Sequence, residues 1–239
     1  VVNLAGEPIA EQRWTVQHLE TLESSRLETT RHLVSALATL AKPPSVLVNA
    51  SAVGYFGTSL DGRFEESSPV GQDFLARLCQ KWEQAAAEKP AATRLVVLRI
   101  GIVLSSQGGA LAKMLPVFRA GFGGPIGSGQ QWMSWIERGD LCRIIQSSLE
   151  TDSWSGVINA VAPDPVTMAV FAGSLGRCLG RPSLLPVPGP MLQLLLGDGS
   201  KVVLEGQFVS SSRLDALGFN FLCPTLLVAL DVATSSSNR

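Results

Sequence analysis

The chain has 239 residues, of which 46% are hydrophobic and 16% charged, a composition typical of a globular protein rather than a disordered or fibrous one. Its 19 Lys and Arg nearly balance 20 Asp and Glu, and no basic run interleaved with aromatic residues occurs, so a nucleic-acid partner is not expected. No stretch of about 20 apolar residues occurs, which argues against a membrane-spanning helix.

Apolar runs with the character of buried strands alternate with amphipathic stretches of helical length. The runs predicted as parallel strands are Val1–Leu4, Val46–Ala50, Leu95–Ile100 and Val157–Ala160. The stretches predicted as helices are Val16–Leu40, Asp73–Glu88, Ala110–Arg119 and Asp140–Leu149. Because parallel strands need long crossovers between them, this alternation predicts an α/β fold with a Rossmann-like, doubly wound sheet.

Between the second and third of these strands, Ser59–Gly71 is predicted as a polar loop. After the third strand the character of the chain changes, and the glycine-rich residues 105–135 are predicted as a loop insertion on the substrate side. Beyond residue 162 the predicted helices become shorter and are separated by Pro and Gly. We therefore expect a sheet domain of residues 1–162 and a small C-terminal domain of residues 163–239.

The two ends of the chain carry different signals. The sequence opens directly on an apolar strand, and the glycine-rich turn that binds phosphate in dinucleotide folds is not found ahead of it. We therefore expect the first βαβ unit of the sheet to precede residue 1, and this chain to carry only part of a ligand site. The polar tail Thr234–Arg239 is expected to be frayed.

The four cysteines are far apart in the sequence, with no Cys-x-x-Cys pair and no Cys/His cluster. We expect reduced thiols, buried as small hydrophobic side chains in a reducing compartment, and no metal site. His18 and His32 fall in one predicted helix, away from any strand end, so a Ser-His-Asp grouping is not expected.

Two strand ends carry residues that suit a ligand crevice. The first strand ends in Asn3-Leu4-Ala5-Gly6, whose small residues allow a flat ligand to approach the backbone, although an ordinary turn has the same composition. Ser51 and Tyr55 follow a buried strand, where a hydroxyl and a phenol suit a carbonyl or carbinol. Both are also common as packed residues at strand ends.

Two further patterns leave alternatives open. Gly121–Gly129 has the composition of a phosphate-binding loop, but it follows a helix and contains Pro125, so a mobile loop on the substrate side is the expected role. Glu65, Glu66 and Glu83 are candidates for paired carboxylates, although acids in loops and on helix surfaces are usually solvated.

The order of the motifs is more specific than any one of them. The series begins with VNLAGEPI, SRLETT, VLVNASAVGYFG, LCQKWE and LRIGIVL, and continues with GGALAKMLPVFRAGFGGPIGSGQQW, SWIERGDL and GVINAVAPDPVT. Over essentially the whole chain it resembles the atypical extended short-chain dehydrogenases/reductases usually labelled NAD(P)-dependent epimerases. That family includes proteins described as cell-division inhibitors and plastid-division factors. Its members carry a C-terminal domain of unknown function, which Leu185–Ala233 resembles.

The resemblance implies a Rossmann sheet that binds NADP(H), a small C-terminal substrate domain, an unknown small-molecule substrate, and a location in the cytoplasm or plastid stroma. The residues matching positions that contact the cofactor in the family are Leu4, Ala5, Gly6, Arg26, Gly101 and Val103. Ser51 and Tyr55 match the strand end where ordinary relatives carry catalytic groups, and they are our tentative catalytic residues.

The sequence departs from the family pattern at the catalytic motif. Ordinary members use Tyr-x-x-x-Lys, in which Lys lowers the pKa of the phenol, but here Leu75 and Cys79 fall at these places. In addition, Glu137 stands where the family typically shows His, and Gly139 where it shows Asp. Three hypotheses for the function follow. The chain is a weak or specialised NADP-dependent oxidoreductase or epimerase, or a non-catalytic NADP-sensing or structural factor linked to cell or plastid division. The third is a truncated copy that has lost ligand binding altogether.

Overall fold

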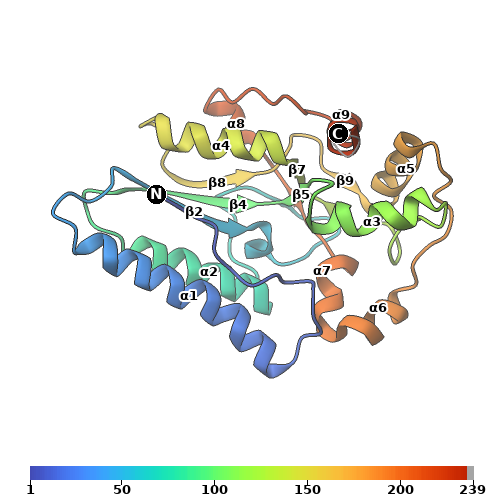
Figure 1. Ribbon diagram of the computed structural model, residues 1–239, viewed down its shortest axis with the longest axis horizontal. Coiled ribbons are helices and arrows are strands. Elements are labelled where there is room, and N and C mark those ends of the chain that lie inside the picture. The colour runs from blue at the N-terminus through green and yellow to red at the C-terminus, as the bar shows by residue number, and fades with distance from the viewer. Residues whose placement is uncertain (236–239) are drawn as a thin grey trace.

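The computed structural model describes residues 1–235, and for residues 191, 192, 195 and 196 it describes only the helical backbone. At its centre lies a four-stranded parallel sheet (Figure 1). The strands, in their order across the sheet, are β1 (Val2–Asn3), β2 (Val46–Ala52), β4 (Arg94–Ile100) and β8 (Gly156–Ala160). The predicted α/β class and all four predicted strands are confirmed.

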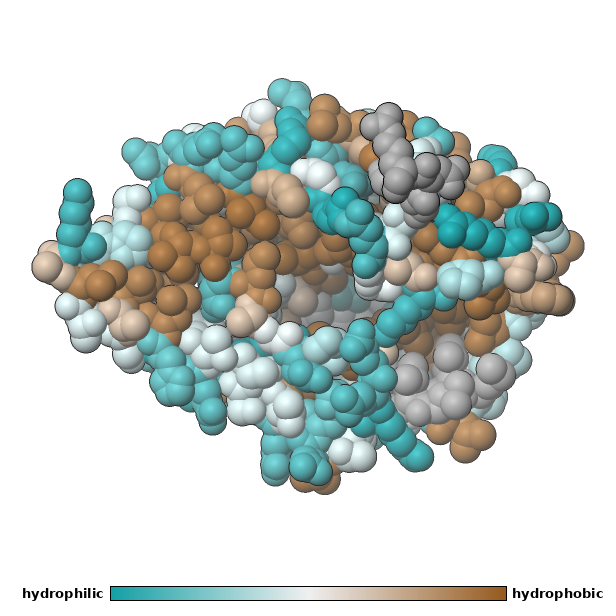
Figure 2. Space-filling model, viewed as in Figure 1, coloured by the Kyte–Doolittle hydropathy of each residue, from teal (hydrophilic) through white to brown (hydrophobic). Residues whose placement is uncertain are grey.

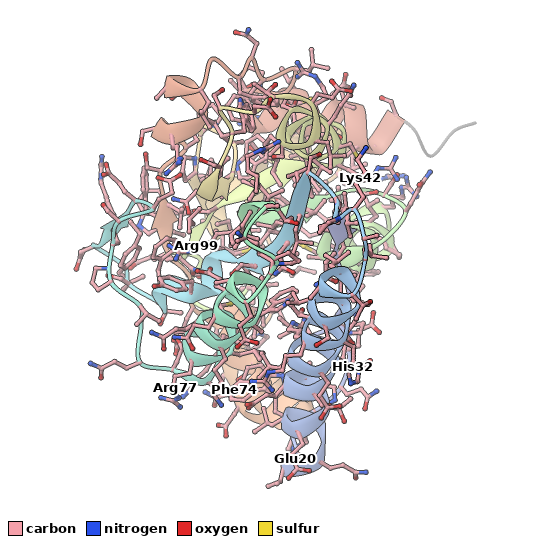
Figure 3. The ribbon with its side chains drawn as sticks, turned by 90° about the vertical axis from the view of Figure 1, so that its left-hand side faces the viewer. Glu20, His32, Lys42, Phe74, Arg77 and Arg99 are labelled. Carbon is pink, nitrogen blue, oxygen red and sulfur yellow. The ribbon has the colours of Figure 1, made fainter. Side chains whose placement is uncertain are left out.

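Helices cover both faces of the sheet. One face is covered by α1 (Val16–Ala38) and α2 (Phe74–Ala87), which lie side by side in Figure 3, and the other by α4 (Arg138–Glu150) and α8 (Ser212–Ala216). The side chains of Thr15 and Asp73 cap the amino ends of α1 and α2 by accepting a hydrogen bond from a backbone N–H three residues on. Both histidines lie in α1, as predicted, and Figure 3 shows His32 on its outer side.

A buried polar network fastens these helices to the sheet. Asn3 Nδ2 donates to Asn49 Oδ1 at 2.7 Å and to Thr30 Oγ1 at 2.9 Å, and Trp82 Nε1 donates to the same threonine oxygen at 2.9 Å. The network joins β1, β2, α1 and α2. Because each donor has a partner, these polar groups are buried without the usual penalty.

Three short strand pairs were missed by the sequence prediction. β3 (Arg63–Phe64) pairs with β10 (Phe208–Val209), β5 (Ile102–Leu104) with β7 (Trp135–Glu137), and β6 (Trp132–Met133) with β9 (Val166–Thr167). The prediction of Ser59–Gly71 as loop was therefore incomplete. Strands of two or three residues are too short to show an alternating hydrophobic pattern, and their partners are distant in sequence.

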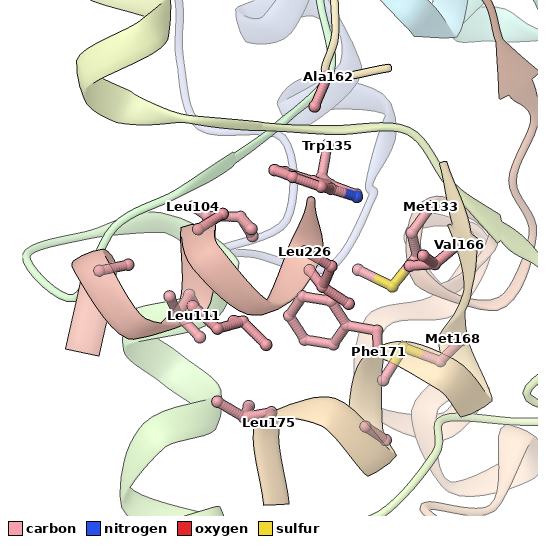
Figure 4. Packing of buried hydrophobic residues seen from close by; sticks show 14 of the residues in the cluster. Leu104, Leu111, Met133, Trp135, Ala162, Val166, Met168, Phe171, Leu175 and Leu226 are labelled. Atoms are coloured by element: carbon pink, nitrogen blue, oxygen red, sulfur yellow. The ribbon is translucent and has the colours of Figure 1, made fainter. Parts of the chain in front are cut away.

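The largest buried hydrophobic cluster lies beyond the carboxyl ends of the sheet strands. It is formed by α3 (Gly109–Arg119), α5 (Met168–Leu179) and α9 (Leu226–Ser235) around Trp135, as Figure 4 shows. The cluster combines residues from both sides of the domain boundary predicted after residue 162, and that boundary stays a prediction. Of the predicted frayed tail, Thr234 and Ser235 end α9, and residues 236–239 lie outside the described part.

The remaining segment runs past the open end of the sheet. It consists of α6 (Gly189–Leu196), the 3₁₀ helix η2 (Gly197–Ser200) and α7 (Lys201–Leu204), at the lower right of Figure 1. Another 3₁₀ helix, η1 (Val53–Phe56), directly follows β2. Among residues 1–235, no helix combines the length and apolar character needed to cross a bilayer.

The glycine-rich loop is fastened to this C-terminal segment. Gly127 N donates to Val187 O at 3.0 Å and Leu185 N to Gly123 O at 3.2 Å. A side chain on Gly124 would lie 2.2 Å from the backbone oxygen of Leu185, so glycine is required there by close contact. The loop predicted as mobile is thus hydrogen-bonded along residues 123–127.

Candidate functional site

A cavity of about 630 Å³ lies at the carboxyl ends of β2 and β4. Its walls come from the ends of these strands, from α1 and α2, and from residues 198–207 of the C-terminal segment. Figure 2 shows this face of the molecule hollowed near its centre. Parallel α/β sheets bind their ligands at this edge, so this cavity is the candidate site.

A buried charge pair lies next to Ser51, one of the residues that line the cavity. Arg99 on β4 binds Glu83 on α2 through two hydrogen bonds, from Nε to Oε1 and from Nη2 to Oε2, both of 2.9 Å. The hydroxyl of Ser51 on β2 donates to Glu83 Oε1 at 2.6 Å. Ser51 and Arg99 are each 3% exposed. The arrangement fixes the position of the Ser51 hydroxyl, and Ser51 is one of the residues that line the cavity.

Glu66, one of the two glutamates predicted in the loop, does not share the hydrogen bonds of the Glu83 carboxylate. The Glu66 carboxylate accepts a hydrogen bond from Asn159 N at 2.9 Å, and its backbone oxygen accepts one from Arg99 Nη1 at 3.1 Å. Glu66 and Glu83 therefore meet the same guanidinium through different atoms rather than as paired carboxylates. In the described part of the chain, no three His, Cys, Asp or Glu side chains group as a metal site would require.

Tyr55 lies on the 3₁₀ helix η1. Its ring is covered by the guanidinium of Arg99, a residue distant from it in the sequence. The Arg99 guanidinium carbon lies 3.3 Å from the ring centroid, a cation–π contact. Ser51 is among the described residues that line the cavity, whereas Tyr55 is not. The catalytic role of Tyr55 stays a prediction.

Arg26 on α1 presents a buried positive charge to the cavity. Its Nη1 donates to Leu22 O at 3.0 Å and its Nη2 to Glu7 O at 2.9 Å, and the guanidinium carbon lies 5.3 Å from the Trp82 ring centroid. Within residues 1–235, no carboxylate lies within 4.0 Å of its side-chain nitrogens. Burial lowers the pKa of Arg26. A buried guanidinium without a carboxylate partner suits an anionic ligand.

Leu75 and Cys79, at the places of the usual Tyr and Lys, both line the cavity. Burial raises the pKa of the Cys79 thiol to about 11, so this side chain stays protonated at neutral pH. Arg26 lines the same cavity, and its positive charge acts to lower the pKa of the thiol. A cation is therefore present near the position of the missing lysine, but it comes from α1.

The predicted cofactor residues gather at one edge of the sheet but not all on the cavity wall. Arg26 and Gly101 line the cavity, whereas residues 4–6 are exposed in the loop after β1, and Val103 is half-buried in β5. A Cβ at Gly6 would lie 2.9 Å from the Arg26 guanidinium carbon. A Cβ at Gly101 would lie 2.4 Å from Ser134 O, so both glycines make room for neighbours.

Sequence reasoning missed the residues that close the cavity. Trp14 packs on the 3₁₀ helix η2, where a Cβ at Gly199 would lie 2.8 Å from its ring, and Trp132 Nε1 donates to Leu60 O at 2.7 Å. Both tryptophans line the cavity, as do Lys201 and Glu205. The glycine at position 199 is the signal available in the sequence, and it gains meaning only once Trp14 lies beside it.

Glu137, which departs from the family pattern, has a local structural role. It is the N-cap of α4, and its Oε2 accepts hydrogen bonds from Gly139 N at 2.5 Å and from Asp140 N at 3.1 Å. A side chain on residue 139 would lie 2.8 Å from that carboxylate oxygen, so Glu137 and Gly139 fit each other.

Comparison with known proteins adds sequence and structural relatives. Residues 187–233 match the family described as Domain of unknown function (DUF1731), in agreement with the prediction for Leu185–Ala233. The chain is 47% identical over 223 residues to "Epimerase family protein SDR39U1 homolog, chloroplastic" of Arabidopsis thaliana, covering 92% of this chain and 64% of that protein. It is 42% identical over 234 residues to "Epimerase family protein SDR39U1" of Mus musculus, covering 96% of this chain and 80% of that protein.

The crystal structure of human epimerase family protein SDR39U1 (isoform 2) with NADPH is similar to this fold throughout. It superposes with a TM-score of 0.95 at 41% sequence identity, covering 98% of this chain and 81% of that chain. The present chain thus spans just under two thirds of the length of the Arabidopsis relative and four fifths of the mouse relative.

Proposed function

Because the chain belongs to the epimerase family that includes SDR39U1, among the extended short-chain dehydrogenases/reductases, we propose that it binds NADP(H) at the cavity beside β2 and β4. The human relative was crystallised with NADPH. The cavity lies at the sheet edge where Rossmann folds take a dinucleotide. Both observations support the same cofactor.

Arg26 is the observation that carries this proposal. Its buried guanidinium has backbone oxygens as partners but no carboxylate within 4.0 Å in the described part of the chain, so a phosphate oxygen would complete its charge-assisted hydrogen bonds. The loop of residues 4–6 would pass along the cofactor, and Gly101 and Val103 would lie toward its nicotinamide end, as the family pattern implies. NADP(H), when bound, supplies hydride transfer.

The reaction proposed is that of an oxidoreductase or epimerase with absent or very slow turnover on generic substrates. Leu75 has no ionisable group, and the raised pKa of the Cys79 thiol keeps it protonated, so neither can shuttle a proton at neutral pH. Ser51 and Tyr55 are the hydroxyl-bearing candidates that remain. The same observation favours a second candidate function, an NADP-sensing protein that binds the cofactor without turnover.

The binding proposal is tested by titrating NADPH and following its fluorescence. Arg26→Gln removes the guanidinium charge, and a charge-assisted hydrogen bond is worth about 1.5–3 kcal/mol, so affinity should fall roughly 10- to 150-fold. Arg31→Gln is the matched control because Arg31 lies on the exposed side of the same helix. Equal affinity of the Arg26→Gln variant and the unaltered chain would contradict the proposal.

The catalytic part is tested by NADPH consumption with a panel of small carbonyl compounds. Any activity found should fall about 10²-fold in Tyr55→Phe, the lower range for loss of a general acid, and should also fall in Ser51→Ala. Rapid turnover that neither substitution changes would place the reacting groups elsewhere.

A further inference from the structure

A second cavity, of about 520 Å³, lies beside α6, η2 and α7 at the lower right of Figure 1. Some of its described lining residues, Trp14 and Lys201 among them, also line the candidate cavity. Arg13 and Ser200, in contrast, line the second cavity and not the candidate cavity. The second cavity therefore adjoins the candidate site but has polar groups of its own.

The basic side chains of the second cavity have no acidic partner. Among the described residues, no carboxylate lies within 4.0 Å of the side-chain nitrogens of Arg13 or Lys201. Ser200 is 2% exposed, and its hydroxyl has no hydrogen-bond partner in the same part of the chain. These three side chains can donate hydrogen bonds to a carboxylate group of a ligand.

Two acidic side chains line the same cavity. Glu205 Oε2 accepts a hydrogen bond from Thr58 Oγ1 at 2.7 Å. Within residues 1–235, neither Glu205 nor Asp198 forms an ion pair with a basic side chain. Because both carboxylates repel negative charge, a phosphate or a dicarboxylate fits this cavity poorly. A ligand with one positive and one negative group can interact favourably with both kinds of side chain.

The cavity also has an apolar surface. The Nε1 atom of Trp14 donates to Ile9 O at 2.9 Å, and the Trp14 ring packs edge-on against Phe74 at 5.5 Å between centroids. Since its polar atom is engaged, Trp14 offers a fixed apolar ring to the second cavity, and Leu204 lines the same space. An aliphatic side chain of a ligand would pack against these two residues.

From these observations we propose that the second cavity binds a free α-amino acid with an aliphatic side chain. The carboxylate of the amino acid would accept hydrogen bonds from Arg13, Lys201 and Ser200. Its ammonium group would face Asp198 and Glu205. The site goes beyond the proposed function, because it needs neither the cofactor nor a reaction.

The experiment titrates the full chain by calorimetry with L-leucine and two analogues that keep its side chain. Isocaproate lacks the ammonium group, and isoamylamine lacks the carboxylate. Leucine should bind about 10-fold more tightly than either analogue, the low end of the range for one charge-assisted hydrogen bond. Equal affinity for leucine and one of the analogues, or no binding of leucine, would overturn the proposal.

Substitutions at the two charges should act selectively. Arg13→Gln should weaken leucine and isocaproate about 10-fold without weakening isoamylamine, and Asp198→Asn should weaken leucine and isoamylamine without weakening isocaproate. If Arg13→Gln does not fold, Lys201→Gln should show the same selectivity. Arg31→Gln and Glu28→Gln, at exposed positions of α1 outside the cavity, are the matched controls. A variant that weakens all three ligands equally would contradict the assigned contacts.

NADPH affinity separates this site from the proposed function. Arg13 does not line the candidate cavity, so Arg13→Gln should leave NADPH affinity unchanged. If Arg13→Gln weakens NADPH and leucine to the same extent, the second cavity is part of the cofactor site and the proposal is wrong. If Arg26→Gln leaves NADPH binding unchanged, the proposed function fails, while the leucine titrations still decide the amino-acid site.

Discussion

Removing the charge of Glu83 should destabilise the protein far more than removing an exposed carboxylate. Glu83→Gln keeps the size of the side chain but replaces one carboxylate oxygen with an NH₂ group. In the unaltered protein each carboxylate oxygen of Glu83 accepts a hydrogen bond from Arg99. In the variant, the NH₂ group would therefore face an N–H donor of the guanidinium. The Arg99 side chain is 4% exposed and that of Glu83 13%, so water does not replace the lost partner.

The magnitude follows from the burial of Arg99. Breaking a buried ion pair by removing one partner costs about 3–5 kcal/mol. Arg99 keeps its hydrogen bond to Glu66 O and its contact with the Tyr55 ring, which favours the lower half of that range. For a chain of this size each kcal/mol corresponds to roughly 2–4 °C, so a loss of about 3–4 kcal/mol should lower Tm by about 6–16 °C.

Urea unfolding followed by circular dichroism measures the free energy of unfolding directly. Glu23→Gln is the control, because its ion pair with Lys81 is exposed and should contribute less than about 1 kcal/mol. Replacing both members of the buried pair, as Glu83→Leu with Arg99→Met, should recover part of the loss because no unpaired charge remains. A loss below 1 kcal/mol in Glu83→Gln, or a double variant less stable than the single one, would refute this reasoning.

Three further predictions concern stability. Thr30→Val removes the acceptor for Trp82 Nε1 and should cost about 1–3 kcal/mol in urea unfolding, whereas Thr30→Ser should cost less. Burial raises the pKa of Cys79 and Cys223 to about 11, so the unfolded chain loses these protons first, and the free energy of unfolding should fall as pH rises from 9 to 11, by up to about 2–3 kcal/mol for the deeply buried Cys79 and by less for Cys223. Glu137→Ala removes the cap of α4 and should cost about 0.5–2 kcal/mol by the same assay.

Each of these has an outcome that would contradict it. A Thr30→Val variant as stable as Thr30→Ser would mean that Trp82 finds another acceptor. If the free energy of unfolding falls as much between pH 9 and 11 when both buried cysteines are replaced by Ala, the loss has another origin. A Glu137→Ala variant that loses no more than Glu150→Ala, at the exposed end of the same helix, would show that the cap contributes little.

Local patterns in the sequence were sufficient to predict the four strands of the central sheet and the helices α1 and α2 that cover it. The four strands are continuous apolar runs, and α1 and α2 begin after Thr15 and Asp73, whose side chains accept hydrogen bonds within the same turn. Such signals lie within a few residues of one another, so they can be found without knowing the tertiary structure. Ser51 was placed at the end of a strand in the same way, and its catalytic role stays a prediction.

The tertiary structure decided which charges face the site. Arg99 belongs to β4 and Glu83 to α2, yet both meet at Ser51, and the cation near the position of the missing lysine is Arg26 from α1. The cavity is completed by residues 198–207, which lie far from β2 in the chain. These contacts depend on how helices pack across a twisted parallel sheet, and a single sequence carries no local signal for that packing. The sequence by itself therefore determined the α/β framework and the position of Ser51 at a strand end, while the folded chain decided which charged side chains surround that residue.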